Sequence, residues 1–140
     1  MKKRLVMGIA SLSLLATACG TGSGSTTDEI TIGSMFEKTG EVSAYGTAEA
    51  NAVNLAIKEI NEAGGLLDKQ INLIEYDTKS DNTEAASIAT KLATQDEAVV
   101  IVGPATTGAV KASTPAVTRA EVSLVTPSGT DDSLTIDENG

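Results

Sequence analysis

The stretch VVIVGPATTG, residues 99–108, decides the fold class of this chain. Four consecutive apolar side chains, Val99 to Val102, predict a short strand that is buried on both faces. Gly103-Pro104 ends the strand, and a helix is expected to begin at Thr106 or Thr107. A buried strand that passes directly into a helix is typical of a parallel sheet covered by helices.

The same alternation of strand and helix signals extends in both directions from this stretch. Further strands are predicted at residues 30–36, 70–77 and 123–126, and helices at 45–63, after Asp81, and from 106 or 107 to 119. Pro115 is expected to kink or split the last helix. With right-handed crossovers, the order β-α-β-α-β-α-β gives an α/β fold with a doubly wound parallel sheet and helices on both faces.

Apolar periodicity predicts which face of each helix meets the sheet. The helix over 45–63 carries a stripe of small and branched residues at helical spacing: Ala48, Ala52, Ala56, Ile60 and Ala63, widened by Val53 and Ile57. Gly64-Gly65 is expected to end it. Asp81 with Glu84 resembles a capping box, and the helix that follows carries Ala85, Ile88, Ala89, Leu92 and Ala93 on one face.

Composition and charge exclude several classes of function. Of the 140 residues, 10 are basic and 19 are acidic. Without Lys2, Lys3 and Arg4, 7 basic residues remain against 19 acidic ones, which gives a net charge of −12. A protein with this charge repels nucleic acid. Histidine is absent and Cys19 is the only cysteine, so the chain can form neither an internal disulfide nor a Cys/His metal site. We therefore expect no metal and no cofactor.

The first residues predict a lipoprotein signal peptide, residues 1–18. A basic start precedes the apolar stretch Leu5 to Leu15, which is short for a membrane span of about 20 residues. Small residues lead to Cys19, a pattern that resembles a bacterial lipobox and implies lipidation of that cysteine. Residues 19–28 are then the lipidated Cys and a flexible Gly/Ser-rich tether, and residues 29–140 the folded part.

Ligands of doubly wound sheets bind beyond the carboxyl ends of the strands. After the third strand, Thr106 and Thr107 bring hydroxyls to a helix start, where free N–H groups and the dipole favour a carboxylate. After the fourth strand, Ser128 and Thr130 bring two more hydroxyls. The loops could hold an amino acid, but the same residues could equally be caps and turns.

Several motifs, in order along residues 29–135, resemble the branched-chain amino-acid-binding family of type I periplasmic binding proteins. They are Thr39-Gly40 with Tyr45-Gly46, Ala52 to Gly65, Tyr76-Asp77, Ile101 to Gly103, and Val125 to Thr130. Ile60-Asn61 followed by Gly64-Gly65 is the most specific of them. The resemblance implies the amino-terminal lobe of a two-lobed receptor, so the chain is interpreted as a truncated, partial ligand-binding lobe.

The resemblance also implies roles for individual residues. Thr107 stands where the family contacts the ligand carboxylate, Ser128 offers a backbone contact, and Thr130 contributes its hydroxyl and backbone. Tyr45 stands at the mouth of the cleft. The resemblance implies an extracytoplasmic, lipid-anchored monomer without catalytic residues. Such a protein captures amino acids, branched-chain ones in particular, for the membrane permease of an ABC importer.

Other binding functions and an enzymatic function are the alternatives to this interpretation. Relatives on the same scaffold bind short amides, urea or aromatic acids, and a receptor ectodomain would share the fold. A sugar site would need more aromatic rings than Phe36, Tyr45 and Tyr76 supply. An enzyme is disfavoured because there is no histidine, no Gly-x-Ser-x-Gly motif and no glycine-rich dinucleotide loop after the first strand.

Overall fold

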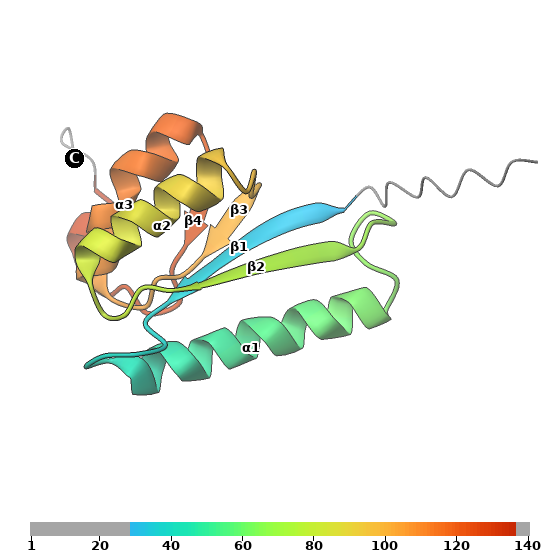
Figure 1. The fold of residues 1–140 in the computed structure, drawn as a ribbon, viewed down its shortest axis with the longest axis horizontal. Coiled ribbons are helices and arrows are strands. Elements are labelled where there is room, and N and C mark those ends of the chain that lie inside the picture. The colour runs from blue at the N-terminus through green and yellow to red at the C-terminus, as the bar shows by residue number, and fades with distance from the viewer. Residues whose placement is uncertain (1–28, 137–140) are drawn as a thin grey trace, which may run out of the picture.

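The computed structural model describes residues 29–136 (Figure 1). The predicted signal peptide, Cys19 and the tether lie outside the described residues. Within residues 29–136, no helix combines the length and the apolar character needed to cross a bilayer.

The core of the fold is a four-stranded parallel sheet. Its strands are β1 (Ile30–Phe36), β2 (Ile71–Asp77), β3 (Val100–Val102) and β4 (Ser123–Val125), in the order β2-β1-β3-β4. β1 pairs with β2 on one side and with β3 on the other, so it is a central strand. All three pairings are parallel, which confirms the predicted doubly wound sheet.

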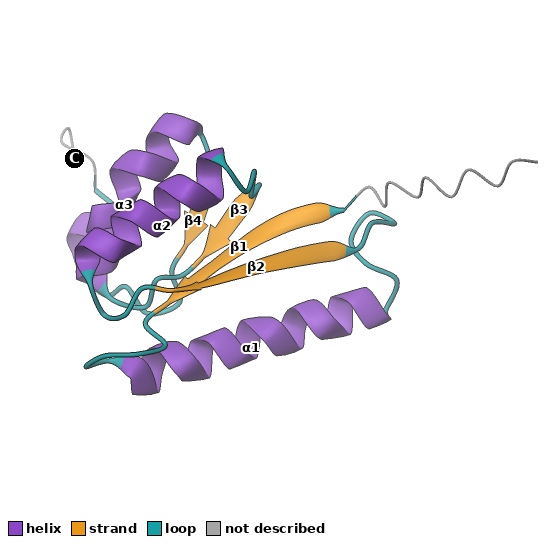
Figure 2. Cartoon of the chain, viewed as in Figure 1, coloured by secondary structure: helices purple, strands orange, loops and turns teal. Residues whose placement is uncertain are grey.

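Helices cover both faces of the sheet, as Figure 2 shows. α1 (Ser43–Glu62) lies on one face, and α2 (Asn82–Thr94) and α3 (Thr107–Ala120) lie side by side on the other. The buried core is divided accordingly. Met35 packs with α2 and α3, whereas Phe36, the next residue of β1, packs with Ala50 of α1 and Ala105.

The predicted face of α2 is confirmed. Ala85, Ala89 and Leu92 are fully buried and Ile88 is nearly so. The side chain of Asp81 caps the helix by accepting a hydrogen bond of 2.8 Å from the Glu84 amide. The N-cap and the apolar face, both predicted from the sequence, are therefore both present in this helix.

The predicted face of α1 is wrong in part. The alanines at 48, 52, 56 and 63 are exposed, and the helix packs through Gly46, Ala50, Val53 and Ile57. Two contacts fix this rotation. A Cβ on Gly46 would lie 2.4 Å from the Glu37 carbonyl oxygen, so the helix approaches the backbone there. At the other end, the Asn61 amide group exchanges two hydrogen bonds with the backbone of Ile71.

Two further expectations need correction. Val99 is 62% exposed and precedes β3, because the strand pairs only from Val100 onwards. Pro115 does not split α3, which runs unbroken through it. Ala109 and Val117, on either side of the proline, are buried in the same core cluster, so both halves of the helix pack against one core.

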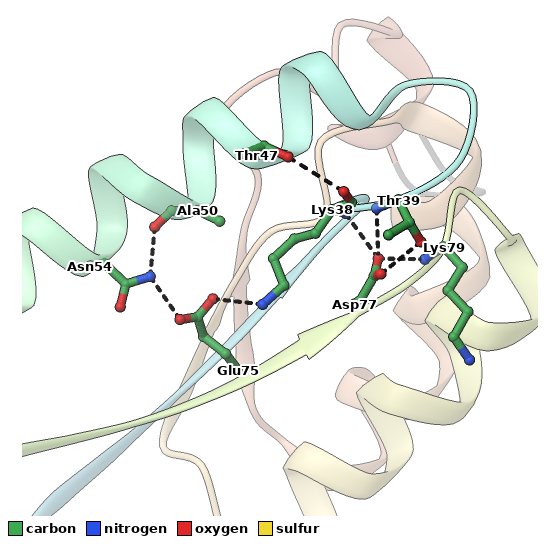
Figure 3. A network of polar contacts seen from close by, with 8 residues as sticks. All are labelled: Lys38, Thr39, Thr47, Ala50, Asn54, Glu75, Asp77 and Lys79. Carbon is green, nitrogen blue, oxygen red and sulfur yellow. Dashed lines mark hydrogen bonds and ion pairs between the residues drawn. The ribbon is translucent and has the colours of Figure 1, made fainter.

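Asp77, the last residue of β2, organises the loop between β1 and α1 (Figure 3). Its carboxylate accepts hydrogen bonds from the amides of Lys38, Thr39 and Lys79, at 2.8–3.1 Å, and from the Thr39 hydroxyl at 2.7 Å. Burial by itself raises the pKa of Asp77, but these donors outweigh it and hold the pKa below 3.8. The loop that leads to Tyr45 is thus anchored by an ionised carboxylate.

We expect Asp77→Asn to lower the free energy of unfolding at pH 7 by about 1–3 kcal/mol. The substitution removes the charged acceptor of the hydrogen bonds from the loop amides and the Thr39 hydroxyl. The folded pKa lies below the unfolded value, so the stabilisation is complete above about pH 4 and is lost as the pH falls through the folded pKa. Urea unfolding at pH 7 and in acid measures both effects. The exposed turn variant Asp68→Asn should match the wild type, and equal stability of Asp77→Asn at pH 7 would contradict the assignment.

Gly103 lets β3 turn into the α3 loop. Its φ is +98°, and a Cβ there would lie 2.1 Å from the Met35 carbonyl oxygen. Gly64 has a φ of +111° but open space around the missing Cβ, which makes a matched comparison. We expect Gly64→Ala to cost only backbone strain, about 1–3 kcal/mol, and Gly103→Ala to cost clearly more, measured by chemical denaturation. Equal losses of unfolding free energy in the two variants would show that β1 shifts away from the added Cβ at no measurable cost.

Candidate functional site

The five residues predicted to bind ligand line one surface hollow of about 390 Å³. They are Tyr45, Thr106, Thr107, Ser128 and Thr130, and the remaining lining residues are Val42 and Ala105. The hollow lies past the carboxyl ends of β3 and β4, where the first turns of α1 and α3 begin. Elements far apart in the sequence therefore meet at the predicted edge of the sheet.

A larger hollow, of about 640 Å³, lies between the carboxyl half of α3, β4 and the short 3-10 helix Asp132–Leu134. Its lining comes from α3, from β4, from the two residues between them and from the segment after β4, and it includes the apolar side chains of Val117, Val122 and Leu124. It takes Thr126 and Gly129 from the loop after β4, but it includes neither the loop after β3 nor Thr107 at the start of α3, which the smaller hollow combines with the loop after β4. We therefore take the smaller hollow as the candidate site.

Glu37 holds the loop between β3 and α3 from inside the protein. Its side chain is fully buried, directly after β1. The carboxylate accepts hydrogen bonds from the amides of Ala105 (3.0 Å) and Thr106 (3.1 Å) and from the Thr106 hydroxyl (2.8 Å). Thr106 thus lines the hollow while its hydroxyl proton is directed to Glu37.

The amino terminus of α3 opens toward the hollow. Thr106 is the N-cap residue, but its side chain makes no capping hydrogen bond to the helix. Thr107 is the first helical residue and lines the hollow. The alternative that Thr107 is the N-cap does not hold, and the first-turn N–H groups lack a side-chain cap, so they remain able to bind an anionic group.

The loop after β4 is fastened to the loop after β3. The Thr126 hydroxyl donates to the Pro104 carbonyl at 2.7 Å and accepts from the Gly129 amide at 3.0 Å. The Ser128 hydroxyl lies 3.1 Å from the Ala105 carbonyl oxygen and 2.6 Å from a carboxylate oxygen of Glu49. The two loops form one polar unit, and the Ser128 side chain is used to build it.

Asp131 fixes the far end of the same loop, next to Thr130. It accepts hydrogen bonds from the hydroxyl and the amide of Ser133, and it pairs with Lys111 of α3 at 3.2 Å. The Ser133 hydroxyl, the Ser133 amide and Lys111 lower the pKa of Asp131 to about 2. Thr130 is therefore held between Ser128 on one side and an ionised, anchored aspartate on the other.

Three hydroxyls remain available at the hollow. Within residues 29–136, the side chains of Tyr45, Thr107 and Thr130 take part in no hydrogen bond, and Tyr45 is 69% exposed. None of the lining residues is charged. Neutral donors around a helix amino terminus suit a small anionic group such as a carboxylate.

The described residues 29–136 hold no group of three His, Cys, Asp or Glu side chains that could bind a metal ion. Four further residues of the site were not predicted from the sequence: Glu37 and Glu49, which support it, and Val42 and Ala105, which line it. A polar residue directly after a predicted strand could have pointed to Glu37. Glu49 follows Tyr45 by one helical turn, but its partner Ser128 is 79 positions away.

Comparison with known proteins finds that this chain is similar to solute-binding proteins. The chain is 34% identical over 107 residues to the Leu/Ile/Val-binding protein BraC3 of Rhizobium johnstonii, covering 76% of this chain and 29% of that protein. Among solved structures, the chain is similar to the substrate-binding protein LivJ of a branched-chain amino acid transporter from Streptococcus pneumoniae, solved with isoleucine. It shares 48% identity with a TM-score of 0.76, over 76% of this chain and 31% of that one.

A solute-binding protein of an ABC transporter from Rhodopseudomonas palustris, solved with 3,4-dihydroxybenzoic acid, shares 26% identity with a TM-score of 0.71, over 77% of this chain and 29% of that one. The chain spans less than a third of the length of each of these relatives. The model of the family described as periplasmic binding protein matches residues 29–139. This match covers most of the chain, which therefore belongs to the periplasmic binding protein family.

Proposed function

We propose that this protein is the substrate-binding component of an ABC importer and that it captures a branched-chain amino acid. The observation that carries the proposal is the uncharged hollow at the start of α3, where the hydroxyls of Tyr45, Thr107 and Thr130 are unpaired. The names of the similar proteins, which bind leucine, isoleucine or valine, support the same ligand class.

In this proposal the ligand carboxylate binds at the amino terminus of α3. The Thr107 hydroxyl and the first-turn amides donate to it, and Thr130 donates from the opposite loop. Two amides of the preceding loop, those of Ala105 and Thr106, already donate to Glu37. Since these two amides are occupied, the ligand carboxylate is expected to bind the free amides of the first turn of α3.

Val42, Ala105 and the Tyr45 ring form the apolar part of the lining, which suits an aliphatic side chain. A carboxylate on an aromatic ring is the second candidate ligand. It is favoured by the relative solved with 3,4-dihydroxybenzoic acid, a ligand that also combines a carboxylate with an apolar body.

Capture in this proposal requires a second lobe that closes over the hollow by a hinge motion. The similar proteins are about three times as long as the matched region, which leaves room for such a lobe. The closed monomer would deliver its ligand to the membrane permease on the extracytoplasmic side. The protein would do no chemistry on the ligand.

We expect leucine, isoleucine or valine to stabilise the full-length protein, with its second lobe and without residues 1–18, in a thermal-shift screen of amino acids, short amides, urea, aromatic acids and sugars. A ligand at 100 times its Kd stabilises by about 2.7 kcal/mol. Thr107→Ala and Thr130→Ala should each weaken binding about tenfold, because each removes a donor to a charged group. Thr90→Ala, on α2 outside the hollow, should bind as the wild type does. Stabilisation by a sugar alone would refute an amino-acid ligand.

We also propose that Cys19 is lipidated and anchors the protein to the bacterial membrane, with residues 20–28 as a tether. The basic and apolar leader that precedes the cysteine supports this assignment. Mass spectrometry of the protein from cell membranes should show a diacylglyceryl group on an amino-terminal Cys19. Cys19→Ser should release the protein from the membrane fraction, and an unmodified cysteine in wild-type protein would exclude the anchor.

A further inference from the structure

One hydrogen bond joins α1 to the loop after β4. The Ser128 hydroxyl lies 2.6 Å from Oε1 of Glu49, a residue of α1. Within residues 29–136, no other hydrogen bond connects this helix with residues 126–130. The contact joins two walls of the hollow, because α1 supplies Tyr45, one turn before Glu49, and the loop supplies Ser128 and Thr130.

The environment of Glu49 indicates that this contact is its role. The second carboxylate oxygen, Oε2, is buried and has no hydrogen-bond partner in the described structure. A buried acceptor without a partner costs free energy, so packing of the helix alone does not favour a glutamate here. What the side chain gains is the short bond to Ser128.

Glu49 cannot contact a ligand directly in this arrangement. It does not line the hollow, and its free oxygen is shielded from solvent. Ser128 does line the hollow, and its single proton is shared between two acceptors, Glu49 and the Ala105 carbonyl. Any influence of Glu49 on binding must therefore pass through the position of Ser128 and its loop.

We propose that Glu49 is a positioning residue for ligand binding: it fixes the loop with Ser128 and Thr130 against the first turns of α1, and so sets the distance between these residues and Tyr45. This inference rests on the proposed function, because it assigns Glu49 to the same site. Without the bond, the 126–130 loop keeps its contacts with the β3–α3 loop but loses its link to α1.

The test compares Glu49→Ala and Glu49→Gln with the matched control Glu59→Gln. Glu59 lies on the same helix and is exposed, and its side chain makes no hydrogen bond or ion pair within residues 29–136. Isothermal titration with isoleucine should show affinity about tenfold weaker for Glu49→Ala. Glu49→Gln keeps an acceptor for Ser128 and should lose only about threefold. Glu59→Gln should bind as the wild type does, and thermal unfolding without ligand should change little in any variant.

A double-mutant cycle with Ser128→Ala tests whether Glu49 affects ligand binding through Ser128. If Glu49 acts through Ser128, adding Glu49→Ala to Ser128→Ala should weaken binding no further. Additive losses, or wild-type affinity in Glu49→Ala, would overturn the proposal. If Glu49→Ala does not fold, Glu49→Gln decides, and wild-type affinity together with unchanged loop exchange in that variant would overturn the proposal.

Hydrogen exchange without ligand separates this proposal from the proposed function. The amides of residues 128–130 should exchange faster in Glu49→Ala than in the wild type, and Glu59→Gln should leave them unchanged. If the wild type binds no amino acid yet this difference is seen, the proposed function fails and the Glu49 link stands. If the wild type binds isoleucine and the exchange is unchanged in Glu49→Ala, the positioning role fails alone.

Discussion

The fully buried carboxylate of Glu37 is the interaction on which the rest of the site depends. It extends from the end of β1, a central strand of the sheet, and accepts three hydrogen bonds from Ala105 and Thr106. A buried charge is tolerated only where such donors surround it. The start of α3 is therefore fixed to the middle of the sheet by a group that would be costly to leave unpaired, and the candidate ligand site is built on that start.

Carboxylates serve the same purpose at two other places. Asp77 gathers the amides of the β1–α1 loop, and Glu49 joins α1 to the loop after β4. Glu37, Asp77 and Glu49 together fix the segments that border the hollow. Part of the acidic composition thus serves as an internal framework for loops rich in backbone donors.

The sequence predicted those features that depend on local pattern. The order of strands and helices along the chain and the buried face of α2 followed from periodicity. The grouping of Thr107 and Thr130 followed from the rule that ligand sites lie beyond the carboxyl ends of parallel strands, and Tyr45 was added by the family resemblance. The face of α1 was mistaken because its rotation is set by Gly46 against Glu37 and by Asn61 against Ile71, which are tertiary contacts. The partners of Glu37 and Glu49 lie 68 to 79 positions away, beyond any local pattern.

The uncharged lining of the hollow has an evolutionary consequence. Of the residues that line it, only Ala105 belongs to a core cluster; the others sit on loops or first helical turns. Substitutions at Val42, Thr107 or Thr130 can therefore change the shape and polarity of the hollow while the packing between sheet and helices stays intact. A scaffold arranged in this way can diversify toward new solutes through a few surface replacements, with little burden on its folding.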